Sequence, residues 1–286
     1  MQHDTIWTGD EPIADYDAAY ANGLAVADSA SYNPRWLADA ASVRERLTLE
    51  GRARLAIPYG DRPRQHYDLF LPEGAPAGLV VFVHGGYWKG QAIAAWSHFA
   101  GGALARGFAV AIPEYTLCPE TTIPAITGEI GTVLENAASE IDGPIRLAGH
   151  SAGGHLVSRM LCSDAPIAPA TAERIDASVS ISGVHDLRPM LRTAMNDVLG
   201  LDLATARAES PALLEPREGV RLTCLVGGAE LPEFRRQNTL LANAWHGLGA
   251  QVCAEEAPGR HHFDIVDELL DPQSDLVAAL TAPVTG

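Results

Sequence analysis

The sequence predicts an α/β protein with a mostly parallel sheet that is covered by helices. From about residue 52 onward, short runs rich in β-forming residues alternate with stretches of helical spacing. Hydrophobic residues make up 47% of the chain and charged residues 20%, as in an ordinary globular protein. The 286 residues can bury a large core, so one main domain is the expected organisation.

Eight short runs are the candidate strands, and the first two are expected to pair antiparallel at one sheet edge. A turn containing Gly60, Asp61 and Pro63 separates these two runs, which leaves no room for a helical crossover. The later runs are separated by helix-length segments. The expected strands are 54–57, 67–71, 79–83, 109–112, 145–148, 177–181, 222–226 and 252–255.

Helical spacing marks three of the connecting segments, 96–106, 123–138 and 233–248. The second of these begins beside Pro124, and proline is tolerated in the first turn of a helix. Each segment is long enough to cross from one strand to the next on a face of the sheet. A sheet flanked by helices is therefore expected.

Two regions break this alternation. Residues 1–50 are expected to form an N-terminal helical segment that packs on the domain formed by residues 51–286. Residues 187–218 contain three prolines around the helix-like stretch 191–201, a pattern suited to a small insertion. Either region, or both, could form a lid over a functional site, and peripheral helices that complete the hydrophobic shell are an equal alternative.

Composition narrows the classes of partner and compartment. The net charge of −16 disfavours nucleic acid and membrane surfaces and leaves a small-molecule substrate as the expected partner. The acidic N-terminus does not resemble a signal peptide and no apolar run approaches a membrane span, so a cytoplasmic location is expected. The four cysteines lack metal-ligand or redox spacing, and neither a metal nor another cofactor is expected. A homodimer is compatible with the sequence.

The segment Gly149–Gly153 reads Gly-His-Ser-Ala-Gly and fits the GxSxG pattern of a nucleophile elbow. It follows the candidate strand 145–148 and precedes a helical run, which is the setting that such an elbow requires. Ser151 is therefore the candidate nucleophile. Its position at a helix N-terminus favours developing negative charge, and the Ala152 N–H is the expected first donor to an oxyanion.

A second glycine-rich segment, His84-Gly85-Gly86-Tyr87-Trp88, directly follows the apolar strand 79–83. It has the form of an HGGG-type oxyanion loop, whose small residues let main-chain N–H groups approach a substrate carbonyl. The N–H groups of Gly86 and Tyr87 are the expected further donors. His84 is expected to be structural, because backbone groups do the work of such a loop.

The general base is expected after the last strand, where two histidines stand side by side. Spacing alone does not separate His261 from His262, and we favour His262. The acid is expected after the penultimate strand, where Glu230 supplies a carboxylate that can hold the Nδ1 of the base. Asp186, after the preceding strand, is the competing candidate.

Three further residues are candidates for substrate contact. Trp88 and Tyr115 could line an aromatic pocket, with core packing as the alternative for each. His150 flanks Ser151 and is as suited to packing at the elbow as to touching a substrate.

These motifs resemble the kynurenine formamidase (arylformamidase) branch of the α/β-hydrolases, close to the hormone-sensitive-lipase-like esterases. The resemblance covers about residues 50–270 and implies the α/β-hydrolase fold, with Ser151, Glu230 and His262 at the triad positions. Glu230 is a departure, since the branch often has Asp there. The likeness is carried by the HGGxW loop at 84–88, by 149–156, by 182–187, by 230–237 with His262-Phe263, and by Tyr32-Asn33-Pro34.

The resulting hypothesis is a serine hydrolase that removes a formyl group from an N-formyl aryl amine such as N-formylkynurenine. A short-chain carboxylesterase would use the same residues and is the second hypothesis. The third, from another class, is an inactive binding protein on this fold. The presence of nucleophile, base, acid and oxyanion loop together favours an enzyme.

Overall fold

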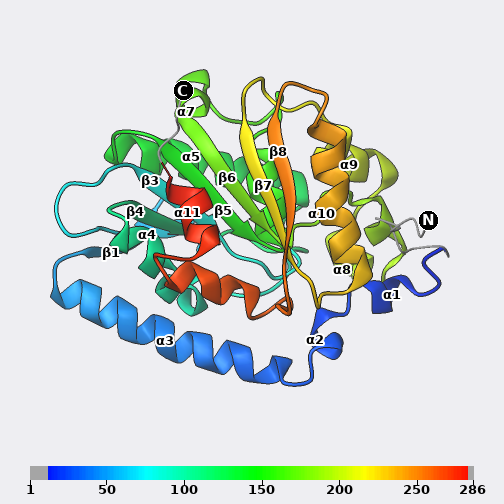
Figure 1. Cartoon of the computed structure of the whole chain (residues 1–286), viewed down its shortest axis with the longest axis horizontal. Helices are drawn as coiled ribbons and strands as arrows, with labels where there is room; N and C mark the ends of the chain where they lie inside the picture. Colours follow the sequence, from blue (N-terminus) through cyan, green and yellow to red (C-terminus); the bar gives the residue numbers. More distant parts are fainter. Residues whose placement is uncertain (1–11, 283–286) are drawn as a thin grey trace, which may run out of the picture.

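The computed structural model describes residues 12–282 and contains one eight-stranded sheet. The strand order is β1-β2-β4-β3-β5-β6-β7-β8 (Figure 1). All eight predicted strands are confirmed, with bounds that differ by at most two residues at either end. They are β1 (Ala53–Pro58), β2 (His66–Phe70), β3 (Leu79–Val83), β4 (Ala109–Pro113), β5 (Ile145–His150), β6 (Ile175–Ile181), β7 (Arg221–Gly227) and β8 (Gln251–Ala257).

The strand directions also follow the prediction. Strands β1 and β2 pair antiparallel at one edge, and β2 pairs antiparallel with β4. The strands β3 to β8 run parallel to one another. Because they are parallel, the carboxyl ends of these strands meet at one edge of the sheet. Every residue of the central strands β3, β4 and β5 is buried, as expected for strands covered on both faces.

Helices cover the two faces of the sheet in separate layers. On one face lie α5 (Ile123–Glu140), α6 (Ala152–Arg159) and α10 (Pro232–Trp245), whose apolar side chains join the core with Leu79, Val81 and Leu147. On the other face lie α3 (Ser29–Leu49), α4 (Gly101–Ala105) and α11 (Asp275–Thr281), packed with Val80 and Phe82.

Two of the predicted helices differ from the structure. The stretch 96–106 is a 3-10 turn, Ser97–Ala100, followed by the short α4, where two adjacent glycines weaken the helix. The stretch 191–201 breaks at Thr193, whose backbone is extended and whose hydroxyl donates to the Met190 carbonyl. What remains there is the 3-10 turn Arg188–Arg192 and the single helical turn α8 (Asn196–Leu199).

The other short elements lie between the sheet strands or after the last of them. They are the helices α7 (Pro169–Glu173) and α9 (Leu203–Ala208) and the 3-10 turns Ile93–Ala95, Pro211–Leu213 and Ile265–Leu270.

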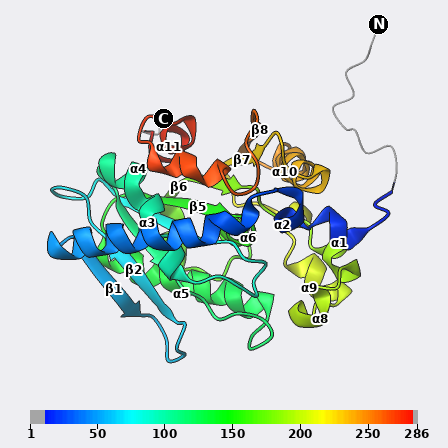
Figure 2. The ribbon, with the colours of Figure 1, turned by 90° about the horizontal axis from the view of Figure 1, so that it is seen from below.

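The described part of the N-terminal segment starts beside the insertion after β6 and then runs along one face of the sheet to β1. It contains α1 (Tyr16–Ala19), α2 (Asn22–Ala25) and the long α3, and α1 lies beside the region of α8 and α9 in both views (Figures 1 and 2). The hydroxyl of Tyr16 accepts a hydrogen bond from Arg192, and the N–H of Ala194 donates to Asp17. The two regions that break the strand and helix alternation are therefore in direct contact.

None of the helices within residues 12–282 combines the length and apolar character needed to cross a bilayer. All four cysteines are free thiols, with Cys118, Cys162 and Cys224 buried and Cys253 exposed.

Candidate active site

Ser151 lies in a strained turn between β5 and α6. Its backbone angles are φ 56° and ψ −115°, a left-handed conformation that is rare for a residue with a side chain. Gly153 makes the turn possible, because a Cβ at this position would lie 2.0 Å from the Val83 carbonyl oxygen. The strand, turn and helix around Ser151 thus have the geometry that the GxSxG pattern predicts.

The loop after β3 packs directly against this turn. A Cβ at Gly85 would lie 3.1 Å from the Ser151 Cβ, which is tighter than ordinary van der Waals contact, so the two segments are closely packed. Tyr87 and Trp88 follow with φ values of 51° and 55°. Gly86 and Tyr87 therefore lie in a bent loop beside Ser151, and Ala152 lies at the first position of α6, where main-chain N–H groups have no partner within the helix.

His262 is held by Glu230. The His262 Nδ1–H donates to Glu230 Oε2 over 2.6 Å, and in the neutral ring with this tautomer the other nitrogen, Nε2, is the acceptor. The second carboxylate oxygen, Oε1, accepts from the hydroxyl of Ser182 at 2.5 Å and from the Gly227 N–H at 2.8 Å. The Glu230 side chain is fully buried by these contacts.

The two competing residues are engaged elsewhere. Asp186 Oδ1 and Oδ2 accept from the Arg188 guanidinium at 2.9 and 2.7 Å. Burial alone would raise the pKa of Asp186, but the hydrogen bonds from Arg188 outweigh it and lower that pKa. His261 Nε2 lies 3.2 Å from the hydroxyl of Tyr32 in α3, so its ring turns toward the N-terminal helix. The structure thus pairs His262 with Glu230, while Asp186 is paired with Arg188 and His261 faces Tyr32.

Aromatic rings enclose the His262 ring. The ring of Phe234 lies 4.7 Å from it, edge to face, and the ring of His150 lies 4.6 Å away. Ser151 is 2% exposed and His262 5% exposed, and no hydrogen bond joins Ser151 Oγ to the His262 ring. Catalytic hydrogen bonds often tighten only when substrate binds, so the closed arrangement is compatible with proton transfer in the complex.

The side chains of His150, Trp88 and Tyr115 are buried and make the packing contacts that were the alternative to substrate contact for each of them. His150 Nε2–H donates to the His262 carbonyl at 2.9 Å, and burial lowers the pKa of His150 far below the ordinary value. Trp88 is buried with its ring against His155, and Tyr115 is buried with its ring stacked on His84 at 4.4 Å. In this closed arrangement all three side chains pack the framework of the site, and their contact with a substrate stays a prediction.

His84 has the structural position expected for it. Its Nδ1–H donates to the Gly85 carbonyl at 2.7 Å, and its other ring nitrogen lies 3.8 Å from Glu114. The Tyr115 hydroxyl donates to the His84 carbonyl at 3.0 Å. These contacts fix the beginning of the glycine-rich loop.

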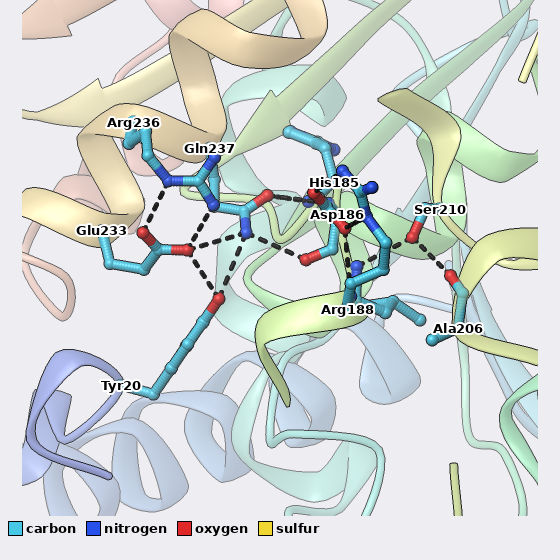
Figure 3. Close-up of polar contacts among 10 residues, drawn as sticks. Tyr20, His185, Asp186, Arg188, Ala206, Ser210, Glu233, Arg236 and Gln237 are labelled. Atoms are coloured by element: carbon cyan, nitrogen blue, oxygen red, sulfur yellow. Dashed lines mark hydrogen bonds and ion pairs between the residues drawn. The ribbon is translucent and has the colours of Figure 1, made fainter. Parts of the chain in front are cut away.

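Residues 15–25, which we call the N-terminal strap, cover the glycine-rich loop. The Tyr87 hydroxyl donates to the Tyr20 carbonyl at 2.5 Å and accepts from Asn22 Nδ2 at 3.0 Å. The Tyr20 hydroxyl donates to Glu233 at 2.7 Å and accepts from Gln237 at 3.2 Å, both in α10 (Figure 3). The strap therefore joins the loop that carries Tyr87 to the helix that follows Glu230.

The sequence assigns no chemical role to several residues of this arrangement. Tyr20 and Asn22 belong to no motif, and Ser182 and Gln237 fall in the stretches 182–187 and 230–237, which carry the family resemblance without a role for either residue. Their proximity to the site depends on how the strap and the loop after β6 are folded back. Sequence spacing contains no such information for contacts between distant segments.

The described residues contain no group of three or more histidine, cysteine, aspartate or glutamate side chains arranged to hold a metal ion. Ser151, the His262–Glu230 pair and the glycine-rich loop together form an arrangement that can transfer an acyl group by nucleophilic attack.

Comparison with known proteins places the chain among hydrolases. The family model described as BD-FAE matches residues 67–211, about half of the chain. The kynurenine formamidase of Salmo salar is 27% identical over 237 residues, which cover 79% of this chain and 80% of the relative.

Solved structures agree with this placement. The crystal structure of a candidate thioesterase from Silicibacter sp. TM1040 is 49% identical, covers 94% of this chain and 99% of its own, and superimposes with a TM-score of 0.88. An esterase from Pyrobaculum calidifontis shares the fold at 18% identity and a TM-score of 0.63, covering 84% of this chain and 90% of its own. The chain therefore belongs to the BD-FAE family and is an arylformamidase-like α/β-hydrolase, an enzyme that acts on a formyl amide or an ester bond.

Proposed function

We propose that the protein is a serine hydrolase that removes the formyl group from an N-formyl aryl amine such as N-formylkynurenine. Ser151 is the nucleophile, His262 the general base and Glu230 the acid that orients it. The observation that carries the proposal is the hydrogen bond from His262 Nδ1 to the buried Glu230 carboxylate, beside a serine in a strained elbow.

The first half of the reaction forms an acyl-enzyme. Ser151 Oγ attacks the formyl carbon while His262 Nε2 accepts the hydroxyl proton. The carbonyl oxygen becomes an oxyanion that accepts hydrogen bonds from the N–H groups of Gly86, Tyr87 and Ala152. When the tetrahedral intermediate collapses, the C–N bond breaks and His262 gives its proton to the departing aryl nitrogen.

The second half regenerates the enzyme. Water attacks the formyl ester of Ser151 and gives one proton to His262, the C–O bond to Ser151 breaks, and the proton returns to Ser151 Oγ. The products are formate and the free aryl amine. Glu230 stays ionised throughout and stabilises the imidazolium form of His262 in both halves.

Two observations support a small acyl group on an aryl amine. The relative from Salmo salar is named a kynurenine formamidase and is aligned over four fifths of this chain. The closed site, with Ser151 and His262 nearly inaccessible and rings packed around the base, suits a formyl group better than a long acyl chain.

An ester substrate is the second candidate. The crystal structure that is 49% identical to this chain is described as a candidate thioesterase, which favours ester chemistry on the same residues. The mechanism would differ only in the leaving atom, an oxygen or a sulfur in place of nitrogen. The shape of the substrate pocket, rather than the reacting residues, therefore determines which of the two substrates is preferred.

Formate release from N-formylkynurenine by the purified protein tests the proposal, with EDTA present to exclude contaminating metalloenzymes. p-Nitrophenyl acetate and an acyl thioester are measured beside it. We expect turnover of the formamide with the highest kcat/KM, and a loss on the order of a millionfold in kcat for Ser151→Ala. Equal or better turnover of either ester would contradict the formamidase proposal and favour the second candidate.

A further inference from the structure

We propose that Ser182 is a positioning residue that fixes the carboxylate of Glu230 for its work with His262. The proposal rests on the proposed triad, because Ser182 acts on the reaction only through Glu230. Ser182 lies immediately after β6, in a loop distinct from those that carry Ser151, Glu230 and His262, and its side chain is fully buried.

The hydrogen bonds of Glu230 divide its two oxygens between two tasks. Oε1 accepts from the Ser182 hydroxyl at 2.5 Å and from the Gly227 N–H at 2.8 Å, whereas Oε2 accepts from His262 Nδ1 at 2.6 Å. Gly227 belongs to the same chain segment as Glu230, so Ser182 is the contact that ties the carboxylate to a neighbouring strand. Hydrogen bonds to an ionised carboxylate are stronger than those between neutral groups.

The backbone of Ser182 is held in an unfavourable conformation. Its φ is 53°, in the left-handed region that residues with a side chain rarely adopt. The Ser182 N–H donates to the Leu225 carbonyl of β7 at 2.7 Å. Such a conformation persists where the surroundings hold it, and it often marks a residue with a functional role.

The rest of the loop is anchored by α10. Gln237 Oε1 accepts from the N–H groups of His185 and Asp186 at 2.8 and 2.7 Å, and Gln237 Nε2 donates to the Asp186 carbonyl at 3.0 Å (Figure 3). Gly183 has no space for a side chain, since a Cβ there would lie 2.3 Å from Ser180 Oγ. The Ser182 hydroxyl is therefore presented to Glu230 from a rigid support.

A purely structural role for Ser182 would have different consequences. If the hydroxyl merely satisfied its own hydrogen-bonding need in the core, its removal would change stability and leave kcat unaffected. If it fixes Glu230, its removal lets the carboxylate turn away from His262, so kcat falls while substrate binding is retained. Measurements of kcat, KM and the free energy of unfolding therefore distinguish the two roles.

The test uses Ser182→Ala and Ser182→Gly, with Ser180→Ala as the matched control. Both Ser182 variants lose the hydroxyl, but glycine also relieves the left-handed backbone, so it provides a folded variant if alanine does not. Ser180 is a buried serine two residues away whose hydroxyl contacts His185. Rates are measured with N-formylkynurenine and with p-nitrophenyl acetate.

We expect kcat to fall about 10- to 100-fold in both Ser182 variants, with KM changed less than about threefold, and Ser180→Ala to match the wild type. In the Glu230→Gln background, Ser182→Ala should lower kcat by less than about twofold further, because the two residues act as one unit.

Three other results would overturn the inference. Wild-type kcat in both Ser182 variants, alongside a severe loss for Glu230→Gln, overturns the role of Ser182 and leaves the proposed function intact. The same is true if Ser182→Ala costs an equal factor with and without the Glu230 carboxylate. If Glu230→Gln itself retains full activity, the proposed triad fails, and the role of Ser182 fails with it.

Discussion

Two carboxylates near the ends of neighbouring strands, Glu230 and Asp186, differ in the side chain that each one faces. Glu230 accepts from His262, whereas Asp186 is paired with Arg188. We expect Glu230→Gln to lower kcat about ten-thousandfold, because an uncharged partner no longer stabilises the imidazolium form of His262. Asp186→Asn should cost less than tenfold, as measured by steady-state rates on one substrate. A severe loss of kcat in Asp186→Asn, together with a mild loss in Glu230→Gln, would identify Asp186 as the acid instead.

The adjacent histidines provide a second comparison. His262→Ala should lower kcat on the order of a millionfold, since loss of the base is as severe as loss of the nucleophile. His261 contacts Tyr32 in α3, so His261→Ala should affect mainly stability and leave kcat within tenfold of the wild type. Steady-state kinetics and thermal unfolding of both variants check this. A millionfold loss of kcat in His261→Ala would identify His261 as the base.

The sequence predicts single residues well where chemistry and local structure share one short segment. Ser151 is an example, because its turn is encoded by the flanking glycines and by the strand before it. Trp88 and Tyr115 are counterexamples, since an aromatic residue is equally suited to a pocket wall and to a core, and only the packed structure decides. The contact of Ser182 with Glu230 could not be predicted, because the stretch 182–187 resembles the family without assigning a role to this hydroxyl, and its partner is 48 residues away.

At the scale of elements, the strap and the glycine-rich loop are joined through the Tyr87 hydroxyl. Tyr87→Phe removes this hydroxyl and keeps the main-chain N–H that is proposed to bind the oxyanion. We expect kcat to fall about 5- to 10-fold, because the strained loop loses the contacts that hold it. Asn22→Ala should have a similar effect, and the double variant should be no worse than Tyr87→Phe alone.

Tyr16→Phe is the matched control for the strap. The Tyr16 hydroxyl contacts Arg192 and not the glycine-rich loop, so this variant should retain wild-type kcat. Wild-type kcat in Tyr87→Phe would show that the strap covers the loop without positioning it. Rates with N-formylkynurenine and p-nitrophenyl acetate provide the measurement for all four variants.

The strands were predictable because buried parallel strands are encoded by continuous apolar runs, as in Leu79–Val83. Helix breaks were harder, since the interruption at Thr193 depends on a hydrogen bond from its side chain to the main chain. The path of the strap depends on contacts with residues about 65 to more than 200 positions away, such as Tyr87 and Glu233, and a local pattern does not contain them.

For the whole molecule, buried histidines make stability depend on pH. Burial lowers the pKa of His98 to about 4, the pKa values of His155 and His185 to about 3, and the pKa of His150 well below its ordinary value. Unfolded histidines titrate near 6.5, so below that pH the unfolded chain binds protons that the folded chain does not. The free energy of unfolding should therefore decrease from pH 7 to pH 5, by on the order of 1 kcal/mol per pH unit for each histidine.

Chemical denaturation at pH 7, 6 and 5 measures this dependence. His155→Gln is a suitable variant, because the amide can replace the hydrogen bond from the His155 ring to the Glu209 carbonyl. Its free energy of unfolding should decrease less steeply than that of the wild type, by about 1 kcal/mol per pH unit. An unchanged slope would mean that His155 is protonated in the folded protein.

The strap has a consequence for how the enzyme responds to heat. Its two helices have only four residues each and bury little apart from Tyr20 and Asn22, whereas the sheet beneath is covered on both faces. Detachment of so small a segment exposes far less apolar surface than melting of the sheet, so it occurs at lower temperature. Activity should therefore fall several-fold on warming before circular dichroism detects any loss of secondary structure, and it should return on cooling.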